Sequence, residues 1–304
     1  MSNIIEVKNL RKSYGEIEAV KGIDFYVERG KLFAFLGPNG AGKSTTIDIL
    51  STLLKPDEGE VLINDYKLGK DDNKIRSSIG VVFQDNLLDN LLTVKENLEL
   101  RGSFYNLEKD ELKEAIRRAA GVCEVNEFIN RPYGKLSGGQ RRRSDIARSL
   151  INTPEILFLD EPTTGLDPQT RKNIWDTIRK MQRDNNMTVF LTTHYMEEAA
   201  EADYVIVIDH GEIVAKGTPS QLKDKYTTDR LILTVRNIEE VKNRLCNENI
   251  DFQQNSDIIQ INLESTFQSL DIVRKVEDVI ESFEVLKGTM DDAFIQITGK
   301  EMRG

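Results

Sequence analysis

The sequence predicts an α/β fold with a mostly parallel sheet, followed by a second, smaller α+β domain. Over residues 1–226, short β-branched runs alternate with segments of helical periodicity. These runs are apolar throughout, as expected of parallel strands that are buried on both faces. After Tyr226 the strand and helix patterns follow the order βαββαβ. At roughly 150 residues per domain, a chain of 304 residues accommodates two domains.

The expected first domain begins with strands, continues with a helical block and then returns to strands. The first strands are predicted at residues 4–7, 17–27, 31–36, 61–63 and 80–83. Residues 93–121 carry apolar side chains three and four apart, as at Val94 and Leu98, which predicts helix. The later strands are predicted at 156–159, 189–192 and 204–208, with helices at 168–183 and 195–201. This alternation indicates crossover helices between parallel strands.

The expected second domain, residues 227–304, has the split pattern of a ferredoxin-like fold. Its strands are predicted at 231–235, 250–254, 258–263 and 283–286, and its helices at 238–245 and 270–280. It contains no glycine-rich loop and no cluster of converging titratable groups. We therefore expect an accessory domain that acts in dimer contact or regulation, and the alternative is a passive tail.

Composition excludes several classes of function. The chain is 39% hydrophobic and 30% charged, which is typical of a soluble globular protein. No apolar run approaches the roughly 20 residues of a membrane-spanning helix, and the first residues lack the pattern of a secretory signal. The net charge of −10 disfavours nucleic acid as a partner, because duplex binding depends on neutralising phosphates. We expect a cytosolic protein.

Cysteine and histidine are too few for a disulfide framework or a zinc site. Cys123 and Cys246 are far apart in the sequence, and the two histidines are His194 and His210. We interpret His210, between Asp209 and Gly211, as part of a solvated turn. Any metal is expected to be magnesium bound by oxygen.

A phosphate-binding loop follows the predicted strand at 31–36. The spacing GxxxxGK[ST] is formed by Gly37, Pro38, Asn39, Gly40, Ala41, Gly42, Lys43 and Ser44, and a helix-like segment begins at Thr45. Glycines let backbone N–H groups converge on phosphate oxygens because no Cβ stands in the way. Lys43 would contact the β- and γ-phosphates, and the Ser44 hydroxyl would bind Mg²⁺. The motif predicts ATP binding in a P-loop NTPase.

Two adjacent carboxylates end the apolar strand at 156–159. Asp160 is expected to reach Mg²⁺, directly or through water, and Glu161 to polarise the water that attacks the γ-phosphate. Neighbouring side chains on a strand point to opposite faces, so both roles require the chain to turn there. Pro162 is expected to end the strand.

A serine and two glycines open a basic helix farther along the chain. Leu136, Ser137, Gly138, Gly139 and Gln140 precede Arg141, Arg142 and Arg143. A helix N-terminus with a hydroxyl and free backbone N–H groups favours an anion. The arginine run is interpreted as a solvated helix face.

This segment resembles the signature of ATP-binding-cassette (ABC) ATPases, and further motifs of that family follow in order. The resemblance identifies Tyr14 as the residue that stacks on adenine, Gln84 as the sensor of Mg²⁺ and of the permease, Asp167 as the D-loop aspartate and His194 as the switch histidine. It implies a P-loop NTPase of ABC type, with a mixed-sheet core and a helical subdomain at about 86–152. It also implies a head-to-tail dimer in which Ser137 of one copy covers the γ-phosphate held by the other.

Four stretches resemble the daunorubicin-resistance-type ATPases, which partner separate exporter permeases. They are residues 131–135, 141–143, 193–199 and 291–299. The resemblance implies an ATP-hydrolysing subunit on the cytoplasmic side of the cell membrane. Two alternatives are a soluble ABC ATPase that remodels nucleic acid or ribosomes, and a nucleotide sensor that does not hydrolyse ATP. The single phosphate loop weighs against the first, and the presence of both Asp160 and Glu161 weighs against the second.

Overall fold

The computed structural model describes residues 2–105 and 107–299. The chain divides into two compact units between Lys216 and Gly217. The division precedes Tyr226, where the sequence patterns placed it, because helix α8 (Pro219–Tyr226) packs against helix α11 (Met290–Thr298) of the second unit.

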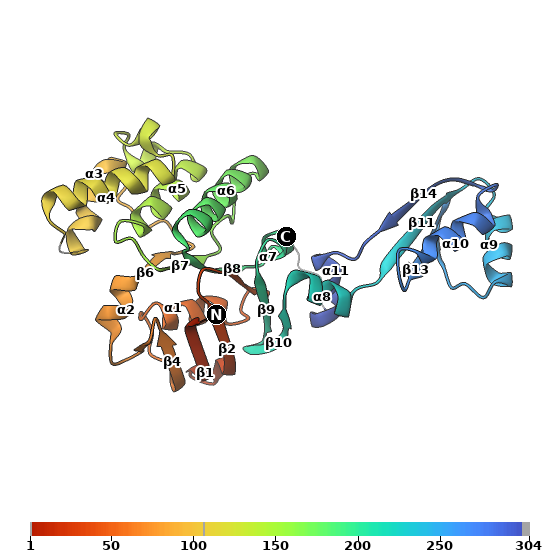
Figure 1. The fold of residues 1–304 in the computed structure, drawn as a ribbon, viewed down its shortest axis with the longest axis horizontal. Helices are drawn as coiled ribbons and strands as arrows, with labels where there is room; N and C mark the ends of the chain where they lie inside the picture. Colours follow the sequence, from red (N-terminus) through yellow and green to blue (C-terminus); the bar gives the residue numbers. More distant parts are fainter. Residues whose placement is uncertain (1, 106, 300–304) are drawn as a thin grey trace. The chain divides into compact units, whose positions relative to one another are not determined.

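The first unit contains two sheets (Figure 1). The antiparallel sheet has the order β2-β1-β4-β5, formed by β1 (Asn3–Tyr14), β2 (Ile17–Glu28), β4 (Glu58–Ile63) and β5 (Tyr66–Lys67). The second sheet has the order β10-β9-β3-β8-β7-β6, formed by β3 (Leu32–Leu36), β6 (Ile79–Val82), β7 (Ile156–Asp160), β8 (Thr188–Thr193), β9 (Tyr204–Asp209) and β10 (Glu212–Gly217). Strands β9, β3, β8, β7 and β6 run parallel. The predicted α/β P-loop fold is therefore confirmed.

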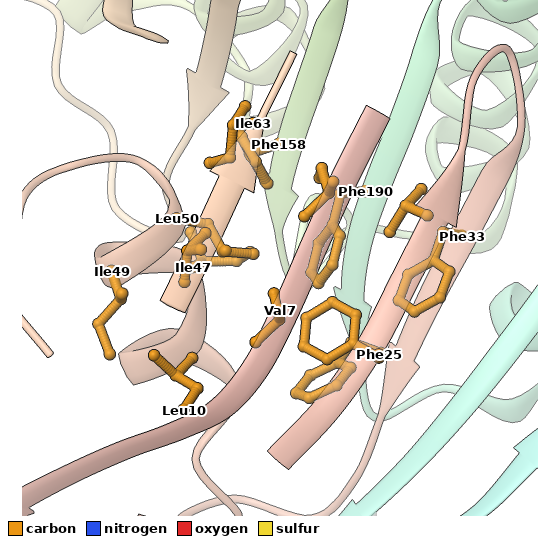
Figure 2. Packing of buried hydrophobic residues seen from close by; sticks show 14 of the residues in the cluster. Val7, Leu10, Phe25, Phe33, Ile47, Ile49, Leu50, Ile63, Phe158 and Phe190 are labelled. Atoms are coloured by element: carbon orange, nitrogen blue, oxygen red, sulfur yellow. The ribbon is translucent and has the colours of Figure 1, made fainter. Parts of the chain in front are cut away.

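An apolar core joins the two sheets to helix α1 (Lys43–Leu50). Phe33 and Phe190 stack with ring centroids 5.0 Å apart, and Phe25 packs against both rings (Figure 2). Ile47 and Leu50 present the buried side of α1 to the same cluster. Because aromatic and branched side chains fill this core, the loop that precedes α1 rests on a rigid base.

Helices cover the rest of the first unit. Its remaining helices are α2 (Asp72–Ser78), α3 (Val94–Gly102), α4 (Lys109–Val122), α5 (Gly138–Ser149), α6 (Pro168–Asn185) and α7 (Met196–Ala200), with short 3₁₀ turns at Ser103–Tyr105, Asn126–Phe128 and Tyr133–Lys135. Helices α3, α4 and α5 pack side by side (Figure 1). Between β6 and β7 the described residues form helices and loops, apart from one bridge between Thr93 and Pro132.

The second unit has the predicted ferredoxin-like order. Its further elements are β11 (Asp229–Val235), α9 (Ile238–Asn247), β12 (Gln253–Asn255), β13 (Ile258–Leu263), α10 (Gln268–Val276) and β14 (Ile280–Leu286). The sheet has the antiparallel order β12-β13-β11-β14. The predicted helix at 270–280 was too long, because Ile280 already pairs with Val235 as the first residue of β14. Leu231, Leu233 and Val241 lie in the core of this unit.

Candidate functional site

The phosphate loop connects the buried strand β3 to α1, as its motif requires. Gly42 has φ +104°, and a Cβ there would lie 2.4 Å from the carbonyl oxygen of Ala19. A Cβ at Gly37 would lie 2.3 Å from the carbonyl oxygen of Ile208. These positions therefore require glycine, which keeps the loop close to the sheet. Asn39 and Gly40 at the tip are exposed.

Lys43 extends from the first turn of α1 into the buried centre of the site. Its Nζ donates to the carbonyl oxygens of Gly37 at 2.8 Å and Pro38 at 3.1 Å. The same Nζ lies 3.3 Å from Glu161 Oε1, and both side chains are less than a tenth exposed. Burial lowers the pKa of Lys43, and Glu161 opposes this shift. The loop thus holds one ammonium group beside the candidate base.

Glu161 also approaches His194, at the end of β8. His194 Nδ1 lies 3.1 Å from Glu161 Oε2, although the ring N–H is not aligned for a hydrogen bond. Thr164 Oγ1 donates to the same carboxylate oxygen at 3.2 Å. Burial alone would raise the pKa of Glu161, but Lys43 and His194 together hold that pKa below its ordinary value. The carboxylate is therefore held in its ionised form, as a general base requires.

The chain turns at Glu161 itself. Strand β7 ends at Asp160, and Glu161 has φ +43°, in the left-handed region that non-glycine residues seldom adopt. Its N–H is directed at the Thr192 backbone carbonyl and hydroxyl oxygens, each 3.2 Å away. The expectation of a turn holds, and the turn begins at Glu161, one residue before Pro162. It directs Asp160 and Glu161 to different partners.

Asp160 lies beside the hydroxyl groups of Ser44 and Thr192. Ser44 Oγ is 3.4 Å from Asp160 Oδ1, and Thr192 Oγ1 donates to the same oxygen. Hydroxyl and carboxylate oxygens are the donors that Mg²⁺ prefers, so this pair fits a magnesium ion. In residues 2–105 and 107–299, no three His, Cys, Asp or Glu side chains gather as a metal site. A magnesium ion would therefore be held by single donors from separate segments.

Ser137 and Gln140 form a capping box at the start of α5. Ser137 Oγ accepts from the Gln140 N–H, and Gln140 Oε1 accepts from the Ser137 N–H at 3.1 Å. A Cβ at Gly139 would lie 2.3 Å from Thr170 Cγ2, so glycine allows α5 to pack closely on α6. Ser137 and Gly138 are exposed. The helix start is thus both ordered and exposed.

Three further predicted residues, Tyr14, Gln84 and Asp167, are exposed. Tyr14, the last residue of β1, is 51% exposed, as a stacking surface for a base would be. Gln84 is exposed in the loop after β6. Asp167 caps α6 by accepting from the Thr170 N–H at 3.0 Å, and hydrogen bonding with Thr170 lowers the pKa of Asp167. The contact of Asp167 with a second subunit remains a prediction. His210 is exposed in a turn with positive φ, consistent with its interpretation.

The interpretation of the arginine run as a solvated face was wrong for Arg142. Its side chain is 5% exposed and donates to the carbonyl oxygens of Phe83, Asp160 and Pro162. Helical spacing did not reveal this, because Asp145 and Ser149, which lie three and seven residues farther along the same buried face, are polar as well.

Sequence reasoning also missed Glu198, a buried carboxylate on α7. It accepts hydrogen bonds from Thr163, Trp175 and Thr193. Thr163 follows the Glu161 turn and Thr193 precedes His194, so Glu198 ties together the two segments that carry these residues. In one sequence, the adjacent Glu197 and Glu198 gave no signal for which of them is buried.

These features define a nucleotide-hydrolysing cassette. The ABC transporter family model matches residues 20–164. The chain is 41% identical over 242 residues to the linearmycin resistance ATP-binding protein LnrL of Bacillus subtilis (strain 168), covering 78% of this chain and 76% of that protein. It is 35% identical over 305 residues to the daunorubicin/doxorubicin resistance ATP-binding protein DrrA of Streptomyces peucetius, and the match covers 97% of this chain and 92% of that protein.

Among solved structures, the chain is similar to the dimeric, post-hydrolysis ATP-binding cassette MJ0796 bound to ADP and Pi. The TM-score is 0.65 at 34% identity, and the match covers 70% of this chain and 98% of that one. The chain belongs to the ABC transporter ATP-binding family and is a DrrA-type ABC ATPase. The alignment with DrrA extends into the second unit, whereas the family model lies within the first.

Proposed function

We propose that this ATPase powers an exporter through a separate membrane permease, and that it works as a head-to-tail dimer with two shared ATP sites. The exposed, capped start of α5 carries the proposal. Lys43 and Glu161 are buried together, whereas Ser137 and Gly138 face outward at the N-terminus of α5, a position that favours an anion. A second copy can then present its own ATP to them.

Each site residue has a proposed role in such a dimer. The loop from Gly37 to Thr45 binds the phosphates, and Lys43 neutralises their charge. Glu161 accepts the proton of the attacking water, and His194 orients the γ-phosphate end of the site. Mg²⁺ held by Ser44 and Asp160 would stabilise phosphate charge when bound, with Gln84 as the neighbouring sensor. Tyr14 stacks on adenine, while Ser137, Gly138, Gly139, Gln140 and Asp167 act across the interface.

The names of the similar proteins support the proposal that this ATPase powers an exporter. The names of both relatives describe ATP-binding proteins of antibiotic resistance. None of the helices in the described part of the chain is both long and apolar enough to span a bilayer. From the likeness to these resistance ATP-binding proteins, we propose that a separate membrane protein supplies the pathway and that the ATPase docks on its cytoplasmic side.

The docking surface proposed for the permease lies after Gln84. Leu87, Leu91, Leu100 and Phe104 are exposed apolar side chains, and Leu91 is 88% exposed. Arg101 donates to the Leu87 carbonyl oxygen at 2.9 Å, which attaches this loop to α3. Co-expression with the membrane protein encoded beside this chain, followed by affinity capture in detergent, tests the docking. We expect co-purification that is lost in Leu91→Glu and kept in Val214→Glu, a control at another exposed apolar side chain on β10. Equal capture of both variants would contradict this surface.

We further propose that the second unit is a folded accessory module for dimer contact or regulation. Its own apolar core supports independent folding. A segment of residues 217–304 is expected to unfold cooperatively, and one of residues 227–304 to be less stable, because Leu222 of α8 is buried where α8 packs on α11. Non-cooperative melting of the longer segment would contradict a module.

A further inference from the structure

Helix α5 and the turn that follows it cover the free edge of the parallel sheet with side-chain donors. Strand β6 is the last strand of its sheet, so one side of its backbone has no neighbouring strand. The carbonyl oxygens of Ile79, Val81 and Phe83 alternate along the chain and accept from Asn152, Arg148 and Arg142, respectively. Such edge carbonyls need partners when they are buried. Two arginines and an asparagine thus supply the hydrogen bonds that a neighbouring strand would otherwise donate.

Arg142 differs from the other two donors because it reaches a second loop. Its Nε donates to the Pro162 carbonyl oxygen at 2.6 Å, and a terminal nitrogen donates to the Asp160 carbonyl oxygen at 3.1 Å. These two carbonyls flank Glu161. Its third bond goes to Phe83, the residue directly before Gln84. A single guanidinium therefore connects the backbone on both sides of the candidate base with the backbone next to Gln84.

The chemistry of this position favours arginine. A planar guanidinium presents five N–H donors in a fixed fork, so it can satisfy three carbonyls in different directions. Its burial is costly, and the nearby Asp145 and Asp160 offset part of that cost through their negative charge. An apolar residue at position 142 would leave these buried carbonyls without a partner, so the guanidinium supplies directed bonds that this edge needs.

Arg142 also belongs to the helix that begins at the signature. Ser137 caps α5, and Arg142 lies within its first two turns. Because a hydrogen-bonded helix moves as a rigid rod over so short a span, a displacement of Ser137 is carried to Arg142. The displacement must then either move the loops at Gln84 and Glu161 or break these bonds.

We propose that Arg142 is a positioning residue for ATP hydrolysis. It holds the Glu161 turn and the loop at Gln84 in fixed relation to the signature helix. It acts through the backbone carbonyls that it binds. The inference rests on the proposed roles of Glu161 and Gln84.

The test compares Arg142 with Arg148, which lies on the same helix, is partly buried and binds the same sheet edge. Steady-state ATPase rates, ATP affinity with a fluorescent ATP analogue, and thermal melts are measured on the full chain. In Arg142→Met we expect kcat to fall at least 10-fold, with KM and analogue Kd within about 2-fold of wild type. In Arg148→Met we expect a comparable drop in Tm, with kcat within about 2-fold.

Arg142→Lys keeps the charge but loses the planar fork, so its kcat should lie between those of wild type and Arg142→Met. If Arg142→Met does not fold, Arg142→Lys alone tests the positioning role. In that case a kcat at least 3-fold below wild type, with an unchanged Kd for the analogue, supports the proposal. A wild-type kcat in Arg142→Lys or Arg142→Met overturns it. Equal losses of kcat in Arg142→Met and Arg148→Met also overturn it, because they would show that the sheet edge serves stability alone.

Glu161→Gln is measured beside these variants, because it tests the base role of Glu161 separately from the positioning role of Arg142. Wild-type turnover in Glu161→Gln would overturn the assigned base. A loss in Glu161→Gln without a loss in Arg142→Met overturns only the positioning role of Arg142.

Discussion

Lys43 Nζ lies 3.3 Å from Glu161 Oε1, so the phosphate-loop lysine and the strand-end carboxylate form a buried ion pair. The two residues are far apart in the sequence and belong to α1 and to the turn after β7. Removing one member of a buried pair leaves the other charge uncompensated, which typically costs about 3–5 kcal/mol. The same pair thus contributes both to the site's charge balance and to its stability.

Lys43→Ala should lose ATP hydrolysis and weaken ATP binding, because phosphate charge in the loop would no longer be neutralised. It should also lower Tm, since Glu161 would remain buried without its partner. Fluorescent-nucleotide titration and a thermal melt measure the two effects. Lys67→Ala is the matched control: it removes an exposed ion pair with Glu60 and should change neither quantity appreciably. Normal turnover in Lys43→Ala would refute the phosphate-loop assignment.

Glu161→Gln should bind ATP but hydrolyse it at least 100-fold more slowly, because an amide keeps the shape of the side chain without acting as a base. With hydrolysis blocked, a long-lived ATP-bound dimer should appear in size-exclusion chromatography. Asp167→Asn offers a comparison at another carboxylate, one that caps a helix. If Glu161→Gln turns over like wild type, His194 becomes the next candidate for the base.

The lowered pKa of Glu161 predicts a pH dependence of stability. A carboxyl whose pKa is lower in the folded state stabilises the fold when ionised, so its contribution is complete above its ordinary pKa. That contribution is lost as pH falls through the folded-state pKa. The Tm advantage of wild type over Glu161→Gln should therefore be constant near neutral pH and shrink below about pH 5. Melts from pH 7 to pH 4 measure it, and an advantage that grows on acidification would reverse the assigned sign.

Ser137→Arg should retain ATP binding by the monomer and lose turnover, because a bulky cation blocks the surface offered to the second copy. Mixing this variant with Lys43→Ala provides a sharper test. In the proposed head-to-tail dimer, each shared site joins Lys43 of one copy to Ser137 of the other, so a mixed dimer would have one intact site and one doubly altered site. Activity that returns on mixing supports shared sites. If none returns, ATP-dependent cross-linking at the interface distinguishes two coupled sites from the absence of a shared site.

The phosphate loop could be located from sequence because its geometry is local. Glycines, the lysine and the following helix lie within one short segment, and the glycines themselves indicate the backbone conformation of the loop. The strand before the loop and the carboxylates after β7 could be predicted for the same reason, since apolar runs and a turn are local signals. The two compact units divide between Lys216 and Gly217, before the predicted boundary at Tyr226, because α8 packs on α11 and such packing leaves no local pattern.

By itself, the sequence determined the family, the alternation of the main strands and helices and the motif residues, because these depend on neighbouring residue types and spacing. Only the tertiary structure decided that Lys43, Glu161 and His194 meet, that Glu161 adopts a left-handed turn, and that Arg142 is buried. The physical reason is that burial and long-range hydrogen bonds depend on which surfaces face each other. For Arg142, three carbonyls from two distant loops converge on one side chain, and only the folded chain brings them together.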